Sequence, residues 1–211
     1  MSRRFFVDSP ITGPRAQLTG AECQHLAQAL RARAGGAVTL FDGSGKEYRA
    51  RVITAGRSCV ELEVLAGREV SRELSPRVTL AVALPKGERQ RWLVEKAVEL
   101  GVACVVPLIT DRGVARPNPR VLSRLRRYVV ESSKQCGRNR LMEIAAPERA
   151  REFFASAPTD TLRILAHISE TAGNIADLAP RPVAETVFLA VGPEGGFSDQ
   201  ELAAADRWQL Y

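Results

Sequence analysis

The sequence predicts an α/β protein built from two parts, and three observations lead to that prediction. The first 65 or so residues contain short stretches that alternate apolar and polar side chains, which is typical of strands with one buried face. From residue 78 onward, continuous apolar runs alternate with helical patterns, which is typical of a parallel sheet covered on both faces. Residues 67–76 (GREVSRELSP) are charged and lack an apolar stripe. We therefore expect one domain over residues 1–72 and another over residues 73–211.

The N-terminal part is predicted to be a small, mostly β barrel with one helix. Phe5 to Val7 begin a strand, and Thr19-Gly20-Ala21-Glu22 has the form of a capping box before a short helix. Apolar residues 38–41 and the alternating residues 48–53 flank a glycine-containing turn, so they predict a hairpin. Residues 59–64 alternate again. Strands this short must close or pack together to bury one face, which favours a barrel.

The C-terminal part is predicted to alternate strands with helices. Strands are expected at 78–84, 103–108, 141–145, 162–166 and 186–191, with helices near 89–100, 119–133, 149–156 and 198–208. In the first of these helices, Trp92, Val94 and Val98 are expected to form part of a buried stripe, while Arg91 and Glu95 lie four residues apart on one face. Gly101 is placed to end that helix. We expect no strand after the last helix.

Composition excludes several classes of protein. Hydrophobic residues make up 45% of the chain and charged residues 26%, close to the averages for globular proteins. No apolar run approaches the roughly 18 residues of a membrane span, and the N-terminus lacks the pattern of a signal peptide, so we expect a cytoplasmic protein. The four cysteines form no C-x-x-C pair and only two histidines are present, which argues against a metal centre and against a disulfide scaffold.

Positive charge is concentrated in one short segment. Residues 116–140 carry eight basic side chains and one acidic side chain, a net +7 where the whole chain carries +6. Such a concentration suits a polyanion, although a solvated helix face is the alternative interpretation.

The end of this segment, residues 131–140 (ESSKQCGRNR), combines cations for phosphates with amides for base edges. Cys136 is interpreted as a small buried residue and not as a nucleophile. In the first part of the chain, arginines beside Phe5 and Phe6 form a pairing used to bind single-stranded RNA. The side chains expected to contact RNA are Arg3, Arg4, Arg31, Arg33, Lys86, Arg91, Arg116, Arg124, Arg127, Lys134, Arg138, Asn139 and Arg140.

A glycine-rich turn follows the last predicted strand. Gly192-Pro193-Glu194-Gly195-Gly196 lies between a buried strand and a second capping-box sequence, the place where open α/β sheets bind ligands. No basic residue occurs between Gly192 and Ala205, so a neutral or cationic nucleoside fits better than a polyphosphate. A tight turn without a ligand is the alternative. His167 ends another strand at the same predicted edge of the sheet.

Several motifs, in order and spacing, cover essentially the whole chain. They are Arg3-Arg4-Phe5-Phe6, His25 to Arg31, Leu40-Phe41-Asp42-Gly43, Lys86-Gly87, Glu95-Lys96-Ala97, Glu99-Leu100-Gly101-Val102, Pro107-Leu108, Glu131 with Gln135-Cys136-Gly137-Arg138, and Val191-Gly192-Pro193-Glu194-Gly195-Gly196. Together they resemble the 16S ribosomal RNA uridine-N3 methyltransferase family of the SPOUT superfamily. The resemblance implies a PUA-like N-terminal barrel, a C-terminal α/β trefoil-knot domain, S-adenosylmethionine as methyl donor, and a homodimer. It also implies a target uridine near the decoding centre of the assembled small ribosomal subunit.

The resemblance also implies roles for individual residues. The cofactor-binding residues would be His167, Val191, Gly192, Pro193, Glu194, Gly195 and Gly196. Arg138 and Asn139 would approach the RNA or the partner subunit, and Arg138 and Glu194 are the catalytic candidates. Methylation of uracil N3 requires loss of the imide proton and in-line placement of the methyl group, so positioning and charge stabilisation can supply most of the acceleration. Neither a metal nor a cysteine adduct is needed.

One departure from the family pattern concerns the C-terminal end of the sequence. The family continues past the helix near residues 198–208 into a strand, a Leu-Gly-x-Arg-[IV]-Leu-Arg-Thr-Glu-Thr-Ala loop and a last helix, whereas this sequence ends at Leu210-Tyr211. We therefore expect a truncated chain with an incomplete knot. A non-catalytic RNA-binding protein is the main alternative function. A nucleotide-dependent oxidoreductase is disfavoured because the sequence lacks a dinucleotide-binding fingerprint.

Overall fold

The computed structural model describes residues 4–29, 33–169, 172–178 and 185–211, and these residues form two compact units. The N-unit comprises residues 1–73 and 130–141, and the C-unit comprises residues 74–129 and 142–211. The helix α3 (Pro119–Cys136) contributes to both units, because its last turns belong to the N-unit. The basic segment is therefore divided between the two units.

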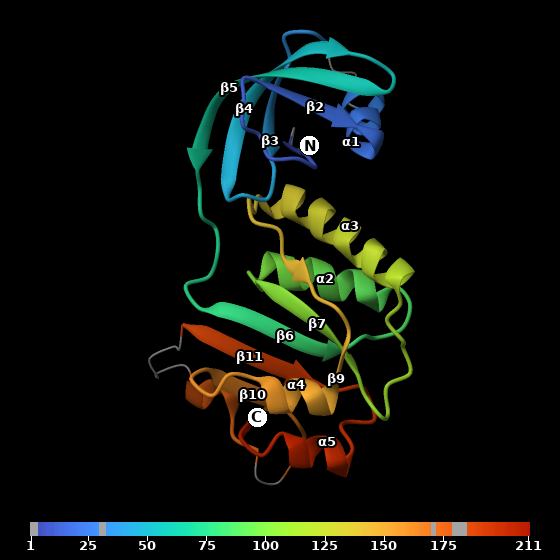
Figure 1. Cartoon of the computed structure of the whole chain (residues 1–211), viewed down its shortest axis with the longest axis vertical. Helices are drawn as coiled ribbons and strands as arrows, with labels where there is room; N and C mark the ends of the chain where they lie inside the picture. The colour runs from blue at the N-terminus through green and yellow to red at the C-terminus, as the bar shows by residue number, and fades with distance from the viewer. Residues whose placement is uncertain (1–3, 30–32, 170–171, 179–184) are drawn as a thin grey trace. The chain divides into compact units, whose positions relative to one another are not determined.

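A five-stranded mixed sheet forms the N-unit and curls around its own core (Figure 1). Its strands are β1 (Arg4–Phe6), β2 (Arg15–Thr19), β3 (Ala37–Phe41), β4 (Lys46–Ala55) and β5 (Cys59–Glu69). The order is β1-β3-β4-β5-β2, with β1 parallel to β3 and the other pairs antiparallel. This confirms the hairpin of β3 and β4. The edge strands β1 and β2 do not pair with each other among the described residues. The sheet is therefore curled, but hydrogen bonds between its two edges do not close it.

Alternation along the strands decides which side chains of the N-unit are buried. Leu18, Leu40, Val52 and Leu62 point into one core, where each is at most 2% exposed. The helix α1 (Gly20–Gln24) and a π-helical turn, η1 (His25–Ala29), follow β2. The capping box expected at Thr19 is wrong, because the Thr19 side chain makes no capping hydrogen bond.

The carboxylate that the capping box needed has other partners. Glu22 accepts a hydrogen bond from the backbone amide of Phe6 at 3.3 Å, and it forms an ion pair with Lys134 at 2.5 Å. These partners come from distant parts of the sequence, so the local four-residue pattern does not reveal them.

A parallel sheet forms the C-unit, as the sequence predicts. Its strands are β6 (Arg77–Ala83), β7 (Cys104–Ile109), β8 (Glu143–Ile144), β9 (Glu148–Arg149), β10 (Leu162–Ala166), β11 (Thr186–Val191) and β12 (Gln209–Leu210). The order is β12-β10-β11-β6-β7-β8, and β9 also pairs with β7. The pairs are parallel. The expectation of no strand after the last helix is wrong, because Leu210 pairs with Leu165 of β10.

Helices cover both faces of this sheet. The helices α4 (Ala150–Ser156) and α5 (Asp199–Ala204) pack on one face, where Phe153, Phe154 and Trp208 contact one another over the buried Ala81 and Ala190. The helix α2 (Arg89–Glu99) lies on the other side of the sheet in Figure 1. A short 3-10 helix, η2, spans Ile175–Leu178. Within the described chain, no helix combines the length and the apolar character that crossing a membrane requires.

The buried stripe of α2 differs from the expected one at Trp92. Val94, Ala97 and Val98 are buried, but Trp92 is 63% exposed. Two residues correspond to about 200° around an α-helix, so Trp92 faces away from Val94. The prediction of a buried Trp92 is therefore wrong, and a large aromatic side chain is left on the surface.

Candidate functional site

The carboxyl edge of the parallel sheet carries the candidate site. There β11 lies between β10 and β6, and Val191 is level with both Ala166 and Val82. After β6 the chain continues to β7 on one side of this pair, whereas after β11 it continues to β12 on the other side, beyond β10. The loops that follow β6 and β11 therefore diverge. Open α/β sheets bind ligands at such a switch point.

A cavity of about 530 Å³ opens at this edge. Its walls come from the end of β6, the first turns of α2, and the glycine-rich loop after β11. The residues are Val82, Ala83, Pro85, Arg89, Trp92, Leu93, Val191, Gly192, Pro193 and Glu194. An adjoining cavity of about 450 Å³ shares Arg89, Pro193 and Glu194 and adds Lys86. Both volumes are in the range of pockets that hold small molecules.

The glycines of the loop meet two different requirements. Gly196 has a φ of +68°, and its amide donates to the Pro193 carbonyl at 2.8 Å, so it closes a tight turn. A Cβ on Gly192 would lie 3.1 Å from the ring of Phe197, which is 2% exposed. Packing alone thus accounts for Gly192. The cavity beside the loop is the separate observation that points to a ligand.

Side chains outside the motif hold the loop in place. Arg112 Nη1 donates to the carbonyls of Gly195 at 2.9 Å and Phe197 at 3.1 Å. The buried Glu201 carboxylate accepts the backbone amides of Ser198 at 2.8 Å and Asp111 at 2.9 Å. Ser198 and Glu201 form the predicted capping box, which is confirmed. Sequence patterns did not indicate Arg112 or Asp111, because they lie in an irregular loop after β7.

The charged groups of the cavity come from different elements. Glu194 lies in the loop and is exposed, while Arg89 begins α2. One cation and one anion therefore border a mostly uncharged cavity, an arrangement that suits a zwitterionic ligand.

Among the described residues, no group of three or more His, Cys, Asp or Glu side chains could hold a metal ion. In the C-unit, burial raises the pKa of the Cys104 thiol to about 11, which keeps it protonated near neutral pH.

Three of the predicted cofactor residues are not among the residues that line either cavity, namely Gly195, Gly196 and His167. His167 follows β10, is half-buried, and donates its backbone amide to the Tyr211 carbonyl at 3.0 Å. Trp92, which the sequence analysis assigned to the core, lines the larger cavity instead. The helical angle between Trp92 and Val94 is the signal that could have revealed it.

Four of the residues expected to contact RNA are engaged inside the N-unit. Arg138 and Asn139 are 3% and 1% exposed, and Arg4 is 6% exposed. Arg138 is paired with Glu73, and Asn139 Nδ2 donates to the Val70 carbonyl at 2.8 Å while its Oδ1 accepts from Arg4. Lys134 is paired with Glu22. These side chains already bind protein groups, so a phosphate would have to displace those partners. The two catalytic candidates, Arg138 and Glu194, belong to different compact units.

The other predicted cations are exposed. They are Arg33 and Arg140 in the N-unit and Lys86, Arg91, Arg116, Arg124 and Arg127 in the C-unit. Arg124 donates to Gln90 Oε1 at 2.8 Å, and the Arg91 guanidinium lies 5.6 Å from the centre of the Tyr128 ring. The exposed face of α2 and the first half of α3 is therefore basic. Arg3 and Arg31 lie outside the described residues.

Comparison with known proteins gives the family. A family model described as an RNA methyltransferase domain matches residues 72–210, and one described as an RNA methyltransferase PUA domain matches residues 18–65. A ribosomal RNA small subunit methyltransferase E from Mycobacterium bovis is 34% identical over 212 residues, covering 95% of this chain and 79% of that protein. The chain belongs to the small subunit methyltransferase E family.

Two further members extend the comparison. The family member from Synechocystis is 32% identical over 190 residues, which cover 89% of this chain and 62% of the relative. The chain thus spans less than two thirds of that protein's length. The crystal structure of the family member from Neisseria gonorrhoeae, bound to S-adenosyl methionine, is 28% identical. It superposes with a TM-score of 0.88 and covers 100% of this chain and 88% of the other.

Proposed function

We propose that this chain transfers a methyl group from S-adenosylmethionine to N3 of a uridine in the RNA of the small ribosomal subunit, near the decoding centre. The observation that carries the proposal is the cavity at the β6 and β11 switch point, walled by Val191 to Glu194. Membership of the methyltransferase E family supports the reaction class. The S-adenosyl methionine in the Neisseria gonorrhoeae structure supports the cofactor.

The residues around the cavity fit such a cofactor. A volume of about 530 Å³ is sufficient for a nucleoside with an amino-acid tail. Gly192 adds no side chain to the wall, so backbone groups can approach a flat ring closely. Arg89 is placed to pair with the carboxylate of the cofactor. When bound, S-adenosylmethionine supplies a methyl carbon made electrophilic by its sulfonium.

The protein groups have separate tasks in the proposed reaction. The exposed Glu194 carboxylate is the candidate to take the N3 proton of the uracil. The indole of Trp92 offers a flat apolar surface on which a ring can stack. Arg112 and Glu201 hold the loop so that its groups need little reorganisation. The burial of Arg138 favours a positioning role over direct contact with RNA.

The proposal also includes features that follow from the family resemblance. These are a trefoil knot in the C-terminal domain, a homodimer, and action on the assembled small subunit, which places the protein in the cytoplasm. Exposed apolar residues on the C-unit support self-association, among them Leu100 at 70% and Val114 at 63%. Sedimentation velocity of the full chain tests the dimer.

Two measurements test the function directly. Titration calorimetry with S-adenosylmethionine should show binding, and small subunits that lack the modification should gain a labelled methyl group, located at uridine N3 by mass spectrometry. RNA binding without cofactor binding would support the alternative of a non-catalytic RNA-binding protein. Binding of neither ligand would contradict both.

Trp92→Ala tests the cavity itself. We expect the binding free energy of S-adenosylmethionine to weaken by about 1 to 3 kcal/mol, because a surface on which its ring can stack is removed. The fold should persist, since Trp92 is largely exposed. Ile175→Ala is the matched control, because Ile175 is an apolar residue on the C-unit that is 61% exposed and lines neither cavity. Equal behaviour of the two variants in calorimetry would contradict a ligand role for Trp92.

A further inference from the structure

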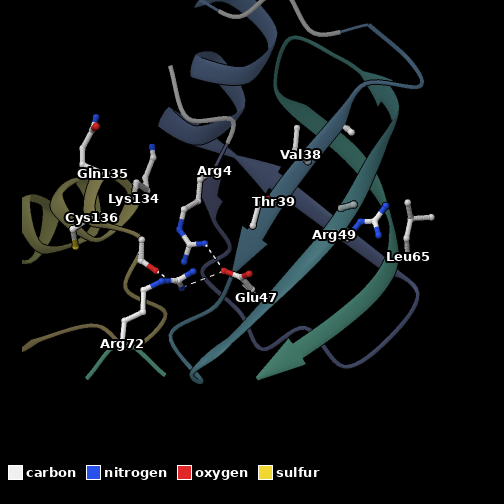
Figure 2. Close-up of a pocket in the computed structure, with 13 residues that line it drawn as sticks. Arg4, Val38, Thr39, Glu47, Arg49, Leu65, Arg72, Lys134, Gln135 and Cys136 are labelled. Atoms are coloured by element: carbon white, nitrogen blue, oxygen red, sulfur yellow. Dashed lines mark hydrogen bonds and ion pairs between the residues drawn. The ribbon is translucent and has the colours of Figure 1, made fainter. Parts of the chain in front are cut away.

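A second cavity, of about 490 Å³, lies entirely within the N-unit (Figure 2). Its walls come from the outer face of β3, β4 and β5, from Arg72, and from the last turn of α3 with Gly137. We call this cavity the arginine groove. Four cationic side chains line it, Arg4, Arg49, Arg72 and Lys134, against a single carboxylate, Glu47. None of these side chains lines the cavities at the sheet edge.

Glu47 fixes the positions of three guanidinium groups. Its buried carboxylate accepts from Arg4 Nη1 at 3.2 Å and from Arg72 Nη1 at 3.3 Å, and it pairs with Arg68 at 2.6 Å. One negative charge thus faces three positive charges. The excess positive charge is held in a defined arrangement, which is what a preorganised anion site requires.

Arg4 is incompletely satisfied in this arrangement. It is 6% exposed, and its Nε has no hydrogen-bond partner among the described residues. Its guanidinium also lies 4.4 Å from the centre of the Phe41 ring. Burial lowers the pKa of Arg4, Glu47 opposes this change, and the nearby Arg72 lowers it further. An additional anion near the groove would therefore stabilise a cation that the protein alone leaves undercompensated.

Two arginines of the groove are exposed to solvent. The Arg72 side chain is 39% exposed and, besides Glu47, donates to the Gly137 carbonyl at 2.8 Å. Arg49 is exposed, and among the described residues no hydrogen bond or ion pair of its side chain is found. Lys134 differs, because its charge is matched by Glu22 at 2.5 Å. Arg49 and Arg72 are therefore the cations available to a ligand.

The positions of these two arginines favour a polymer over a single small anion. In Figure 2, Arg72 lies with Arg4 near the end of α3, whereas Arg49 lies beside Leu65 on the other side of Glu47. An extended ligand with repeated negative charges can contact both. Residues 1–73 and 130–141 carry 14 basic and nine acidic side chains, so the N-unit holds +5 of the chain's +6. Long-range attraction of a polyanion is thus directed to this unit.

We propose that the arginine groove binds the backbone of single-stranded RNA, with Arg49 and Arg72 contacting separate phosphates. The choice of RNA rests on the proposed function and on the match of residues 18–65 to an RNA methyltransferase PUA domain. Leu65, which is 43% exposed, gives the groove an uncharged wall beside Arg49. Glu47 does not contact the RNA in this arrangement and acts as the positioning residue for the arginines.

Arg49→Ala is the direct test. A fluorescein-labelled single-stranded RNA of 12 nucleotides is titrated with the full chain over a series of salt concentrations. Each phosphate contact on a single strand contributes a slope of about 0.7 in the logarithm of the association constant against the logarithm of salt concentration. Arg49→Ala should therefore reduce the slope by about 0.7 and weaken binding several-fold. Arg15→Ala, an exposed arginine on β2 outside the groove, should keep the wild-type slope.

A second test uses a variant that should bind RNA more tightly, because misfolding would not increase affinity. Leu65→Lys adds a cation to the groove wall at an exposed position, so it should tighten RNA binding and steepen the salt slope. Ala55→Lys, at the exposed end of β4 and outside the groove, adds the same charge without the contact. Indistinguishable results for Leu65→Lys and Ala55→Lys, or for Arg49→Ala and Arg15→Ala, would overturn the proposal. Preference for a duplex of the same sequence, or for an acidic peptide, would also overturn it.

Cofactor binding separates this inference from the proposed function. Arg49→Ala should keep the wild-type affinity for S-adenosylmethionine. If the wild type binds RNA with the expected dependence on Arg49 but binds no cofactor, the proposed methyl transfer fails and the groove stands. If methyl transfer is observed but Arg49→Ala binds RNA as the wild type does, the groove fails and the function stands. A wild type that does not bind the RNA overturns the groove.

Discussion

At the scale of single residues, Glu47 organises more of the N-unit than any motif in the sequence indicated. Burial by itself raises the pKa of Glu47, but the guanidinium groups of Arg68 and Arg72 outweigh burial and hold the pKa below its ordinary value of 4.5. The sequence places Glu47 on a hairpin strand but does not indicate its partners. Arg68 and Arg72 follow it by 21 and 25 residues, and Arg4 precedes it by 43.

Glu47→Gln should destabilise the N-unit by about 3 to 5 kcal/mol, because three guanidinium groups lose their common counter-charge and Arg4 is buried. Since the folded pKa of Glu47 is lowered, its contribution to stability is complete above pH 4.5 and is lost as the pH falls through the folded pKa. Hydrogen exchange of β4 at pH 7 and over a series of pH values below 4.5 measures both effects. The difference between variant and wild type should shrink as the pH falls.

Glu63→Gln is the control for this prediction. Glu63 lies on the neighbouring strand β5 and pairs with Arg51 at 3.8 Å, but both side chains are at least 50% exposed. Exposed pairs contribute about 0 to 1 kcal/mol. A cost for Glu47→Gln as small as that for Glu63→Gln would show that Glu47 does not hold the arginines.

For the same reason, local sequence patterns did not reveal that Arg138 and Asn139 are buried. The run of polar residues at the end of the basic segment predicted RNA contacts, and no local feature distinguishes a free cation from a buried one. The partner of Arg138 is Glu73, 65 residues earlier, and Asn139 bonds to Val70, 69 residues earlier. Only the packed structure brings these groups together.

At the scale of elements, hydrophobic periodicity predicted the order of strands and helices in the C-unit, because each element buries a face of its own. Details of helix phase and capping depend on neighbours and were less predictable. Trp92 and Val94 both belong to an apolar pattern, yet only Val94 faces the sheet. Capping-box sequences stand directly before α1 and α5, and only the one at Ser198 forms both of its hydrogen bonds.

The two capping sequences give a matched pair of substitutions. Ser198→Ala should destabilise α5 by about 1 kcal/mol, since the hydroxyl accepts the Glu201 amide. Thr19→Ala should cost much less, because the Thr19 side chain caps nothing. Hydrogen exchange of residues 199–204 and 20–24 by mass spectrometry measures each helix separately. Equal acceleration of exchange in the two helices would contradict the capping assignment.

At the scale of the whole molecule, the two compact units differ in charge and in the kind of cavity they contain. The N-unit carries a net +5 and contains the arginine groove, while the C-unit carries +1 and contains the cavity at the sheet edge. The sequence predicted two parts and a concentrated positive charge. It could not show that α3 gives its last turns to the N-unit, because the helical pattern continues without a break through residue 129.

This division predicts that RNA binding and cofactor binding can be impaired separately. Gly195→Val should weaken binding of S-adenosylmethionine while preserving the fold. A Cβ at Gly195 meets only Arg112, at 3.5 Å or more, and Arg112 holds the loop that carries the cavity residue Glu194, so the added side chain should shift that loop. Arg49→Ala should raise KM for small subunits and leave cofactor affinity unchanged. The two residues share no partner among the described contacts.

The double variant tests whether the units act independently. If they do, the loss of RNA affinity in the double variant should equal that of Arg49→Ala alone, and its loss of cofactor affinity should equal that of Gly195→Val alone, each within about 0.5 kcal/mol. Calorimetry and anisotropy on the four proteins complete this cycle. A weaker RNA affinity in Gly195→Val itself would show that the cofactor loop communicates with the groove, and the assignment of one ligand to each unit would then be wrong.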